Sequence, residues 1–222
     1  MIVAIDGPSG TGKSTTARLL SQKLDFQYID SGALYRGITL LLIKNKINPK
    51  DKEKIENIVK NTNFEFKDET VIMNGNDVTN DIRTIEVNNS VSSVSKIKEI
   101  RELICEKQRT FVKGRNTVIE GRDIGTVVFP EAEFKFYLNC DINTRAARRQ
   151  QDFLDSGIKV PIEKIMKELE MRDEIDKTRK ISPLKKAEDA IEVDTTNMII
   201  EEQVDFLLKK IINSEKYQII FN

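Results

Sequence analysis

Residues 7–14 are a glycine-rich turn, Gly-Pro-Ser-Gly-Thr-Gly-Lys-Ser, between a short apolar run and a helical pattern. The apolar run, residues 2–5, has no polar interruption, which is typical of a strand buried on both faces of a parallel sheet. Apolar residues then recur at helical spacing through residues 13–24. A strand, a turn and a helix in this order form one unit of an α/β fold, because parallel strands need a crossover connection between them.

The same alternation continues along the chain and predicts a parallel sheet of five strands. The other four strands are expected at residues 26–29, 117–119, 134–138 and 191–193. The last helix is expected at residues 199–212, with Thr195 and Thr196 before it as the two candidates for its N-cap.

Residues 63–83 interrupt this pattern between the second and third strands. Apolar and polar residues alternate there, and Asn74-Gly75 is typical of a type I′ hairpin turn, so a small antiparallel insertion is expected. In the helix that follows, Arg101 and Gln108 are seven residues apart and share a face that would suit a ligand.

The composition excludes several classes of function. The chain has 222 residues, 36 basic and 36 acidic side chains and no histidine. The absence of histidine excludes Ser-His-Asp triads and most zinc sites, and the balanced charge argues against a general nucleic-acid binder. No membrane span or signal peptide is expected, which favours a cytoplasmic protein. Cys105 and Cys140 fit no disulfide or metal pattern and are expected to be buried, reduced thiols.

The turn at residues 7–14 matches the phosphate-binding pattern GxxxxGK[ST] in full. Backbone N–H groups of such a turn surround a phosphate, and the helix N-terminus adds partial positive charge. Lys13 would reach the β and γ phosphates of a nucleoside triphosphate, and Ser14 would ligate Mg²⁺. A glycine-rich turn that binds nothing is the alternative. The predicted nucleotide-binding residues are Gly7, Pro8, Ser9, Gly10, Thr11, Gly12, Lys13, Ser14 and Thr15.

Two further segments follow predicted strands, at the sheet edge where α/β folds bind ligands. Residues 30–36 offer hydroxyl and guanidinium groups close together. Their alternative is a capped helix start, with Asp30 or Ser31 as N-cap and a solvated Arg36. Residues 120–123 include a glycine that permits close approach of a ligand, and their alternative is a surface turn.

Two arginine-rich stretches lie in the second half of the chain. The first has three arginines three or four residues apart, near one face of a helix, and the second has two arginines and an aspartate at i, i+4 and i+7. They are Arg145, Arg148 and Arg149, and Arg172, Asp176 and Arg179. Each stretch alone is typical of a solvated helix with salt bridges. Beside a triphosphate site, they favour phosphoryl transfer between two polyanions, which requires positive charge at the transferring group.

Five segments resemble the bacterial type of cytidylate kinase, in the order found in that family. They are GPSGTGKST at 7–15, DSGALYRG at 30–37, NGNDVTNDIRT at 74–84, EGRDIGTVVFPEA at 120–132 and RDEIDKTRKISPL at 172–184. The resemblance covers nearly all of residues 1–212. The three middle segments are far more specific than the phosphate-binding turn and separate this family from adenylate, thymidylate and shikimate kinases.

The resemblance implies the P-loop NTPase fold, as a single kinase domain of three parts. The core would comprise residues 1–30, 116–144 and 185–222. The monophosphate-binding region would comprise residues 31–115, with the insertion at 63–83, and a short helical lid would comprise residues 145–184.

The resemblance also implies roles for individual side chains. The catalytic residues would be Lys13, Arg148, Arg149, Arg172 and Arg179. Cytosine and the acceptor phosphate would be held by Ser31, Arg36, Ser92, Arg101, Arg122 and Asp123, while Asp176 and Arg179 would contact the sugar. Asp123 would accept a hydrogen bond from the cytosine amino group, which uracil lacks. Lys177 stands where relatives often have arginine.

The reaction implied is in-line transfer of the γ phosphoryl group from Mg-ATP to CMP or dCMP, in pyrimidine nucleotide metabolism. No general base is needed, because the acceptor phosphate oxygen is already anionic, and lid closure would exclude water. The resemblance points to a monomer, with no nucleic-acid or membrane partner expected. Two alternatives stay open: a kinase for another small acceptor such as UMP, and a P-loop switch or ATP-binding regulator.

Overall fold

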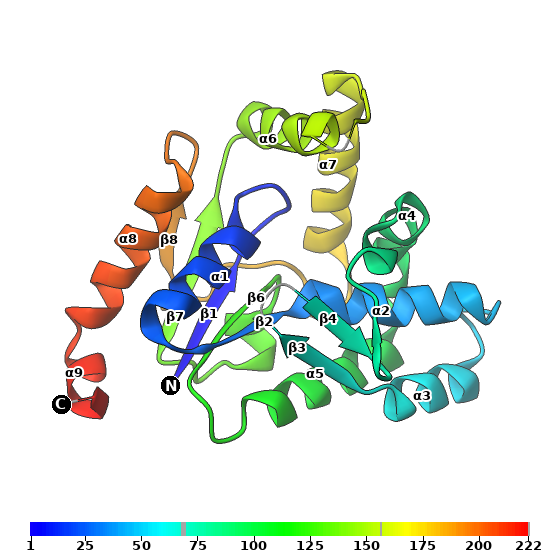
Figure 1. Cartoon of the computed structure of the whole chain (residues 1–222), viewed down its shortest axis with the longest axis horizontal. Helices are drawn as coiled ribbons and strands as arrows, with labels where there is room; N and C mark the ends of the chain where they lie inside the picture. The colour runs from blue at the N-terminus through cyan, green and yellow to red at the C-terminus, as the bar shows by residue number, and fades with distance from the viewer. Residues whose placement is uncertain (68–69, 156, 222) are drawn as a thin grey trace. The chain divides into compact units, whose positions relative to one another are not determined.

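The computed structural model describes residues 1–67, 70–155 and 157–221 (Figure 1). The chain divides into two compact units, one of residues 1–27 and 115–222 and the other of residues 28–114. Four positions of the predicted insertion, lid and C-terminal tail lie outside the described residues, namely 68, 69, 156 and 222.

The five-stranded parallel sheet predicted from the sequence is confirmed, with the strand order β2-β6-β1-β7-β8. Its strands are β1 (Ile2–Asp6), β2 (Gln27–Asp30), β6 (Thr117–Gly121), β7 (Phe134–Asn139) and β8 (Ile191–Asp194). β1 pairs in parallel with β6 on one side and β7 on the other, so that Ile5 lies opposite Glu120 and Phe136. Val3, Ala4 and Ile5 are fully buried, as the uninterrupted apolar run of β1 requires at the centre of a sheet.

Helix α1 (Lys13–Leu24) begins directly after the glycine-rich turn, at the residue predicted from the sequence. It packs beside α8 (Ile200–Ile212), and Figure 1 shows the two helices together against the sheet. The helix α9 (Glu215–Phe221) follows α8.

The N-cap of α8 is Ile199, so the prediction of Thr195 or Thr196 as N-cap is wrong. Both threonines stand too far before the first helical residue to reach its free N–H groups. The side chain of Glu202 instead accepts from the Ile199 N–H at 3.0 Å. The Thr195 hydroxyl lies 3.1 Å from the Thr11 carbonyl, and the Thr196 hydroxyl accepts from the Asp141 N–H at 3.1 Å.

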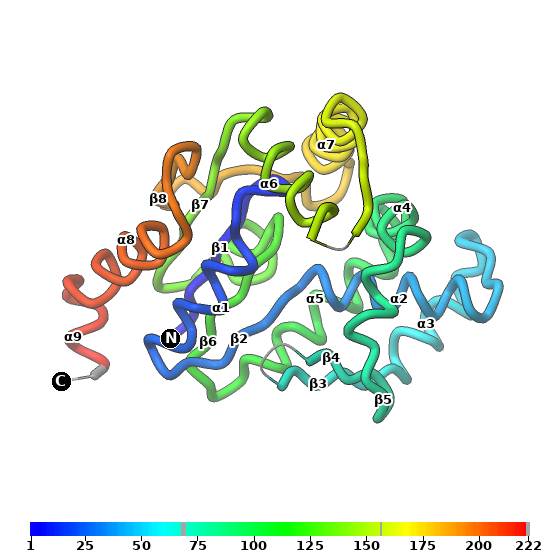
Figure 2. The backbone as a smooth tube through the Cα atoms, turned by 45° about the horizontal axis from the view of Figure 1, so that its top comes forward, coloured from blue at the N-terminus to red at the C-terminus, as the bar shows by residue number. Residues whose placement is uncertain are grey.

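Helices α6 (Ile142–Asp155) and α7 (Ile162–Thr178) pack against each other and lie together in Figures 1 and 2. Ala146, Ile165 and Leu169 form a small apolar cluster between them. The segment between β6 and β7 contains a π-helical turn, η2 (Ile124–Val128). Such turns are uncommon and are often found at functional sites.

The second unit contains the predicted antiparallel insertion, which is confirmed as a small sheet in the order β3-β4-β5. Asn74 and Gly75 have φ angles of 52° and 80°, the pair of positive values that a type I′ turn requires. The elements of this unit are α2 (Ser31–Lys44), α3 (Lys52–Asn61), β3 (Phe64–Lys67), β4 (Thr70–Met73), β5 (Asn76–Asp77), η1 (Asp81–Arg83), α4 (Ile85–Val94) and α5 (Lys98–Val112).

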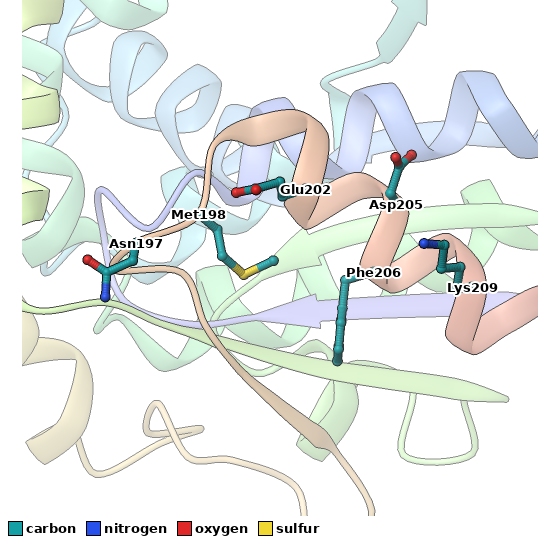
Figure 3. A pocket seen from close by; sticks show the side chains of 6 residues that line it. All are labelled: Asn197, Met198, Glu202, Asp205, Phe206 and Lys209. Carbon is teal, nitrogen blue, oxygen red and sulfur yellow. The ribbon is translucent and has the colours of Figure 1, made fainter.

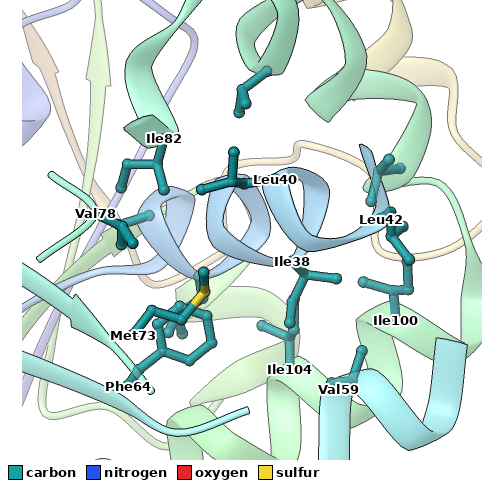
Figure 4. Close-up of a cluster of buried hydrophobic side chains, with 14 of the residues drawn as sticks. Ile38, Leu40, Leu42, Val59, Phe64, Met73, Val78, Ile82, Ile100 and Ile104 are labelled. Carbon is teal, nitrogen blue, oxygen red and sulfur yellow. The ribbon is translucent and has the colours of Figure 1, made fainter. Parts of the chain in front are cut away.

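The core of the second unit lies between α2, the small sheet and α5 (Figure 4). Ile38 of α2 and Ile100 and Ile104 of α5 are fully buried in it. The ring of Phe64 packs so closely on Gly37 that a Cβ atom there would lie 2.5 Å from the ring. The small sheet is therefore fixed to α2 by a contact that only glycine permits.

Two other sequence-based expectations have different outcomes. Both cysteines are free, and Cys140 is buried, but Cys105 is only half-buried, so the prediction of two buried thiols is wrong for Cys105. Its neighbour Ile104 occupies the inward face of α5 and turns Cys105 toward the helix edge. Within residues 1–67, 70–155 and 157–221, every helix is too short or too polar to cross a lipid bilayer.

Candidate active site

Lys13 is a buried residue that opens α1 and folds back over the glycine-rich turn. Its Nζ donates to the Pro8 carbonyl at 2.6 Å and lies 3.3 Å from the Thr11 hydroxyl. Burial, and next the positive charge of Arg122, lower the pKa of Lys13 to about 7. A phosphate on the turn would supply the negative charge that favours the ammonium form.

The conformation of the turn depends on its glycines. Gly10 and Gly12 have φ angles of 81° and 89°, in the left-handed region that other residues rarely adopt. A Cβ atom on Gly12 would also lie 2.9 Å from Gln203 Oε1. The backbone therefore has the shape that lets successive N–H groups surround an anion.

Ser14 and Glu120 join the start of α1 to the end of β6. The Ser14 hydroxyl donates to Glu120 Oε1 at 2.6 Å. Glu120 and Asp123 are buried, at 4% and 5% exposure, so the alternative of a surface turn at residues 120–123 is wrong. The site thus has a hydroxyl and a carboxylate oxygen side by side, both ligand types that Mg²⁺ prefers.

Asp6, the last residue of β1, organises the segment after β6. Its carboxylate accepts from the N–H groups of Ile124 and Gly125 at 2.9 and 2.7 Å. These bonds fix the first residues of η2, directly after Arg122 and Asp123 in the chain. Burial raises the pKa of Asp6 from 3.8 to about 7. Asp6 stands directly before the phosphate-binding pattern, but no residue of that pattern marks it as part of the site.

We expect Asp6 to make the stability of the protein depend on pH. Because the folded chain holds a proton on Asp6 that the unfolded chain releases above about pH 4, the free energy of unfolding falls as the pH rises toward 7. The slope approaches about 1.4 kcal/mol per pH unit at most. Urea unfolding at several pH values between 4 and 8 measures it, and Asp6→Asn should be flatter over this range. Equal slopes for both proteins would contradict the assignment.

Four charged side chains form a buried network in the first unit. Asp176 Oδ2 accepts from Arg122 Nε at 2.9 Å, and Asp176 Oδ1 lies 3.3 Å from Arg179 Nη1. Arg179 Nη2 lies 3.5 Å from Asp123 Oδ1. Burial alone would raise the pKa of Asp176, but the neighbouring guanidiniums outweigh it and hold that pKa below its usual value. The structure thus joins two predicted acceptor segments that are more than fifty residues apart.

The spacing predicted one helix through Arg172, Asp176 and Arg179, but Arg179 lies just outside that helix. Helix α7 ends at Thr178, and Arg179 is its C-cap. The Arg179 side chain reaches back to Asp176 and also donates from Nε to the Ser182 carbonyl at 2.6 Å.

The three arginines of α6 have different partners. Arg145 is buried and pairs with Asp173, whereas Arg148 donates to the Thr195 and Met198 carbonyls at 2.7 and 3.1 Å. Arg149 lies 4.8 Å from the ring centre of Phe153 and is half-exposed. The solvated-helix alternative is therefore wrong for Arg145.

In the second unit, Asp30 is the N-cap of α2 and accepts from the Ala33 N–H at 2.9 Å. Arg36 is not solvated, because its Nη2 pairs with Asp30 Oδ2 at 2.6 Å. Ser31 is the buried first residue of the helix. The segment therefore combines a capped helix start with an oriented guanidinium.

Arg101 and Ser92 of the second unit are connected through Ser95. Arg101 is buried, and its Nη1 donates to the Ser95 carbonyl at 3.1 Å, while the Ser95 hydroxyl donates to the Ser92 carbonyl at 3.0 Å. The Arg101 guanidinium lies 5.3 Å from the ring centre of Tyr35. Gln108, which shares the predicted face with Arg101, is also buried.

Comparison with known proteins identifies the family. The family model for cytidylate kinase matches residues 3–213. The chain belongs to the cytidylate kinase family. A cytidylate kinase of Fusobacterium nucleatum is 46% identical over 211 residues, which cover 95% of this chain and 97% of the relative. One of Carboxydothermus hydrogenoformans is 45% identical over 213 residues, which cover 94% of this chain and 96% of the relative.

A solved structure of an uncharacterized protein from Eubacterium ventriosum is also similar, with a TM-score of 0.54. Its sequence is 12% identical, and the match covers 96% of this chain and 99% of that one. At this level of identity the likeness shows a shared fold alone.

A hollow lies beside α8, and one of its lining residues, Met198, accepts from Arg148 through its carbonyl. It is lined by Asn197, Met198, Glu202, Asp205, Phe206 and Lys209 (Figure 3). None of these residues belongs to the predicted site. Among the described residues, no group of three or more cysteine, aspartate or glutamate side chains is placed to hold a metal ion.

Proposed function

We propose that the chain transfers the γ phosphoryl group of ATP to CMP or dCMP, giving ADP and CDP or dCDP. The observation that supports this most strongly is the buried network of Arg122, Asp176 and Arg179 with Asp123, in the unit that also contains the phosphate-binding turn. A nucleotide switch has no need of two guanidiniums, one buried and one half-buried, held in fixed directions by carboxylates. Membership of the cytidylate kinase family supports the same function.

The donor nucleotide is proposed to bind at the turn. Lys13 would contact the β and γ phosphates, and the backbone N–H groups would surround them. The Ser14 hydroxyl, 2.6 Å from the Glu120 carboxylate, fits the ligand preference of Mg²⁺. When bound, Mg²⁺ would neutralise charge on the phosphates. The turn residues with this role are Gly7, Pro8, Ser9, Gly10, Thr11, Gly12, Lys13, Ser14 and Thr15.

The acceptor is proposed to bind arginine, serine and aspartate side chains of the segments that resemble the family. These are Ser31, Arg36, Ser92, Arg101, Arg122, Asp123, Asp176 and Arg179. Planar guanidinium groups bind phosphate oxygens in pairs, which suits a 5′ phosphate. Asp123 is buried and would accept from the cytosine amino group.

Phosphoryl transfer would depend on position and charge, since the acceptor phosphate needs no base. Arg148, Arg149 and Arg172 are proposed to approach the phosphates together with Arg179. The Arg148 guanidinium is oriented by two carbonyls of the segment after β8, which supports a fixed role for it. We further propose a monomer acting in the cytoplasm in pyrimidine nucleotide metabolism, without nucleic-acid or membrane partners.

The test is ADP formation from Mg-ATP with CMP, dCMP, UMP, AMP and dTMP, for the wild type and Arg122→Ala. We expect rapid turnover with CMP and dCMP only. The variant should lose about two orders of magnitude in kcat/KM, because a charged hydrogen-bond donor to the acceptor phosphate is removed. Strong turnover with UMP would indicate a different acceptor. ATP binding without stimulation by any monophosphate would favour a switch.

A further inference from the structure

Arg145 is a buried arginine to which the proposed chemistry assigns no role. It lies in the first turn of α6 and is 6% exposed. Its backbone is fixed at the helix start, where Asp141 Oδ1 accepts from the N–H groups of Asn143 and Thr144 at 2.9 and 3.0 Å. The Arg145 side chain therefore leaves from a fixed point.

One nitrogen of Arg145 connects two segments that are far apart in the sequence. Nη1 donates to Asp173 Oδ2 of α7 at 2.7 Å and to the Ser9 carbonyl of the phosphate-binding turn at 3.2 Å. Removing one partner of a buried ion pair leaves the other charge uncompensated, so each side chain depends on the other. The pair thus links the turn to α7 through a single guanidinium.

The contact with Ser9 determines the direction of a neighbouring N–H group. In a trans peptide, the carbonyl and the following N–H point in opposite directions in one plane. With the Ser9 oxygen held on Arg145, the Gly10 N–H must point away from α6. A phosphate-binding turn acts through the directions of its N–H groups, so this orientation bears directly on nucleotide affinity.

A second contact holds the same part of the turn. Gly10 packs so closely on α6 that a Cβ atom there would lie 3.1 Å from Arg145 Cβ and 3.4 Å from the Arg145 carbonyl oxygen. The tip of the turn is therefore positioned by the backbone and the side chain of one residue. The π-helical turn at Ile124–Val128 and the hydrogen bond between Ser14 and Glu120 involve other residues than Ser9 and Gly10.

Asp173, the partner of Arg145, lies on α7 close in sequence to Asp176, which pairs with Arg122 and Arg179. It follows Arg172 and precedes Asp176 by one helical turn on α7. Asp173 is 7% exposed, and its Oδ1 has no hydrogen-bond partner in the described part of the chain. Arg145 is therefore the side chain that orients the Asp173 carboxylate.

We propose that Arg145 is a positioning residue, which with Asp173 sets the conformation of the phosphate-binding turn and ties it to α7. This inference rests on the proposed function, because it assigns the turn to ATP. Arg145 itself touches no reacting atom. It acts through the Ser9–Gly10 peptide on the affinity for the donor nucleotide, and it leaves acceptor binding unchanged.

The experiment compares Arg145→Gln, Arg145→Lys and Asp173→Asn with the wild type. Direct binding of Mg-ATP is measured without CMP, and KM values for ATP and CMP are measured separately. We expect Arg145→Gln to weaken Mg-ATP binding about tenfold or more, with the KM for CMP within about twofold. Arg145→Lys keeps one donor and should restore part of the affinity. Asp173→Asn should have a smaller effect, since the Ser9 contact remains.

Lys23→Gln is the matched control, because it removes an exposed ion pair, with Asp205 at 2.7 Å, from the far end of α1. The melting temperature of each variant without nucleotide shows whether the substitution destabilises the fold, apart from any effect on Mg-ATP binding. A lower melting temperature with unchanged Mg-ATP affinity would overturn the inference and leave a structural ion pair. Failure of the wild type to phosphorylate CMP would refute the proposed function instead, and the direct Mg-ATP measurement would still decide the role of Arg145.

Discussion

Lys13→Met should lower kcat/KM by about a thousandfold or more, the largest effect expected of a single substitution in the donor site. The substitution removes the Lys13 ammonium group, whose Nζ lies against the Pro8 carbonyl and the Thr11 hydroxyl. A preorganised donor in a buried site is typically worth a factor of about 10² to 10³ in rate, and the full charge on Lys13 adds to this. Steady-state ADP formation with saturating CMP measures the loss.

The substitution should not unfold the protein, because methionine fills the same space and the buried ammonium is costly before ATP binds. The pKa of Lys13, lowered to about 7 by burial, reflects that cost. Lys23→Met on the exposed end of the same helix is the control and should keep normal activity. If Lys13→Met retained more than about a tenth of wild-type activity, the turn would not be the site of phosphoryl transfer.

The parts of the fold that were predictable depend on local signals. The start of α1 at Lys13 follows from a pattern whose lysine must stand at the helix N-terminus. The turn at Asn74-Gly75 follows from backbone conformations that few residue pairs adopt. The buried β1 strand follows from its unbroken apolar run. In each case, neighbours in the sequence contain the physical cause.

The helix α4 had a much weaker local signal. Its sequence, IEVNNSVSSV, is rich in serine, asparagine and valine, which have low helix propensity. The helix forms because Val87, Val91 and Val94 face the core of the second unit. Tertiary burial therefore overrides the low helix propensity, and the helical spacing of the three valines is the local indication of it.

In the candidate site, too, local spacing was predictable and contacts between distant segments were not. Spacing placed Arg172 and Asp176 on one helix correctly, but it could not reveal that Asp176 pairs with Arg122 across 54 residues of sequence. For a similar reason the sequence pattern did not mark Asp6, and it marked Arg145 only as a member of an arginine-rich stretch. Their importance lies in backbone groups, the N–H of Ile124 and Gly125 and the carbonyl of Ser9, which have no sequence signature.

Asp176→Ala should be the most damaging substitution in the proposed acceptor site. Asp176 contacts both Arg122 and Arg179, at 2.9 and 3.3 Å. Its removal takes that partner from the buried Arg179 and the half-buried Arg122, which is expected to cost about 3 kcal/mol of stability. Because the guanidiniums hold the pKa of Asp176 below its usual value, this stabilisation is present at neutral pH and lost in acid. Urea unfolding at pH 7 measures the loss.

The same variant separates support of the fold from support of the acceptor. We expect the KM for CMP to rise about a hundredfold, with direct Mg-ATP binding nearly unchanged, because Arg122 loses its orientation while the phosphate-binding turn keeps its own contacts. Asp205→Ala, which breaks an exposed pair with Lys23, should cost less than about 1 kcal/mol and leave both constants unchanged. A variant that lost stability but kept its KM for CMP would show that the network braces α7 and does not hold the acceptor. Equal weakening of ATP and CMP binding would instead indicate a general loss of the fold around β6.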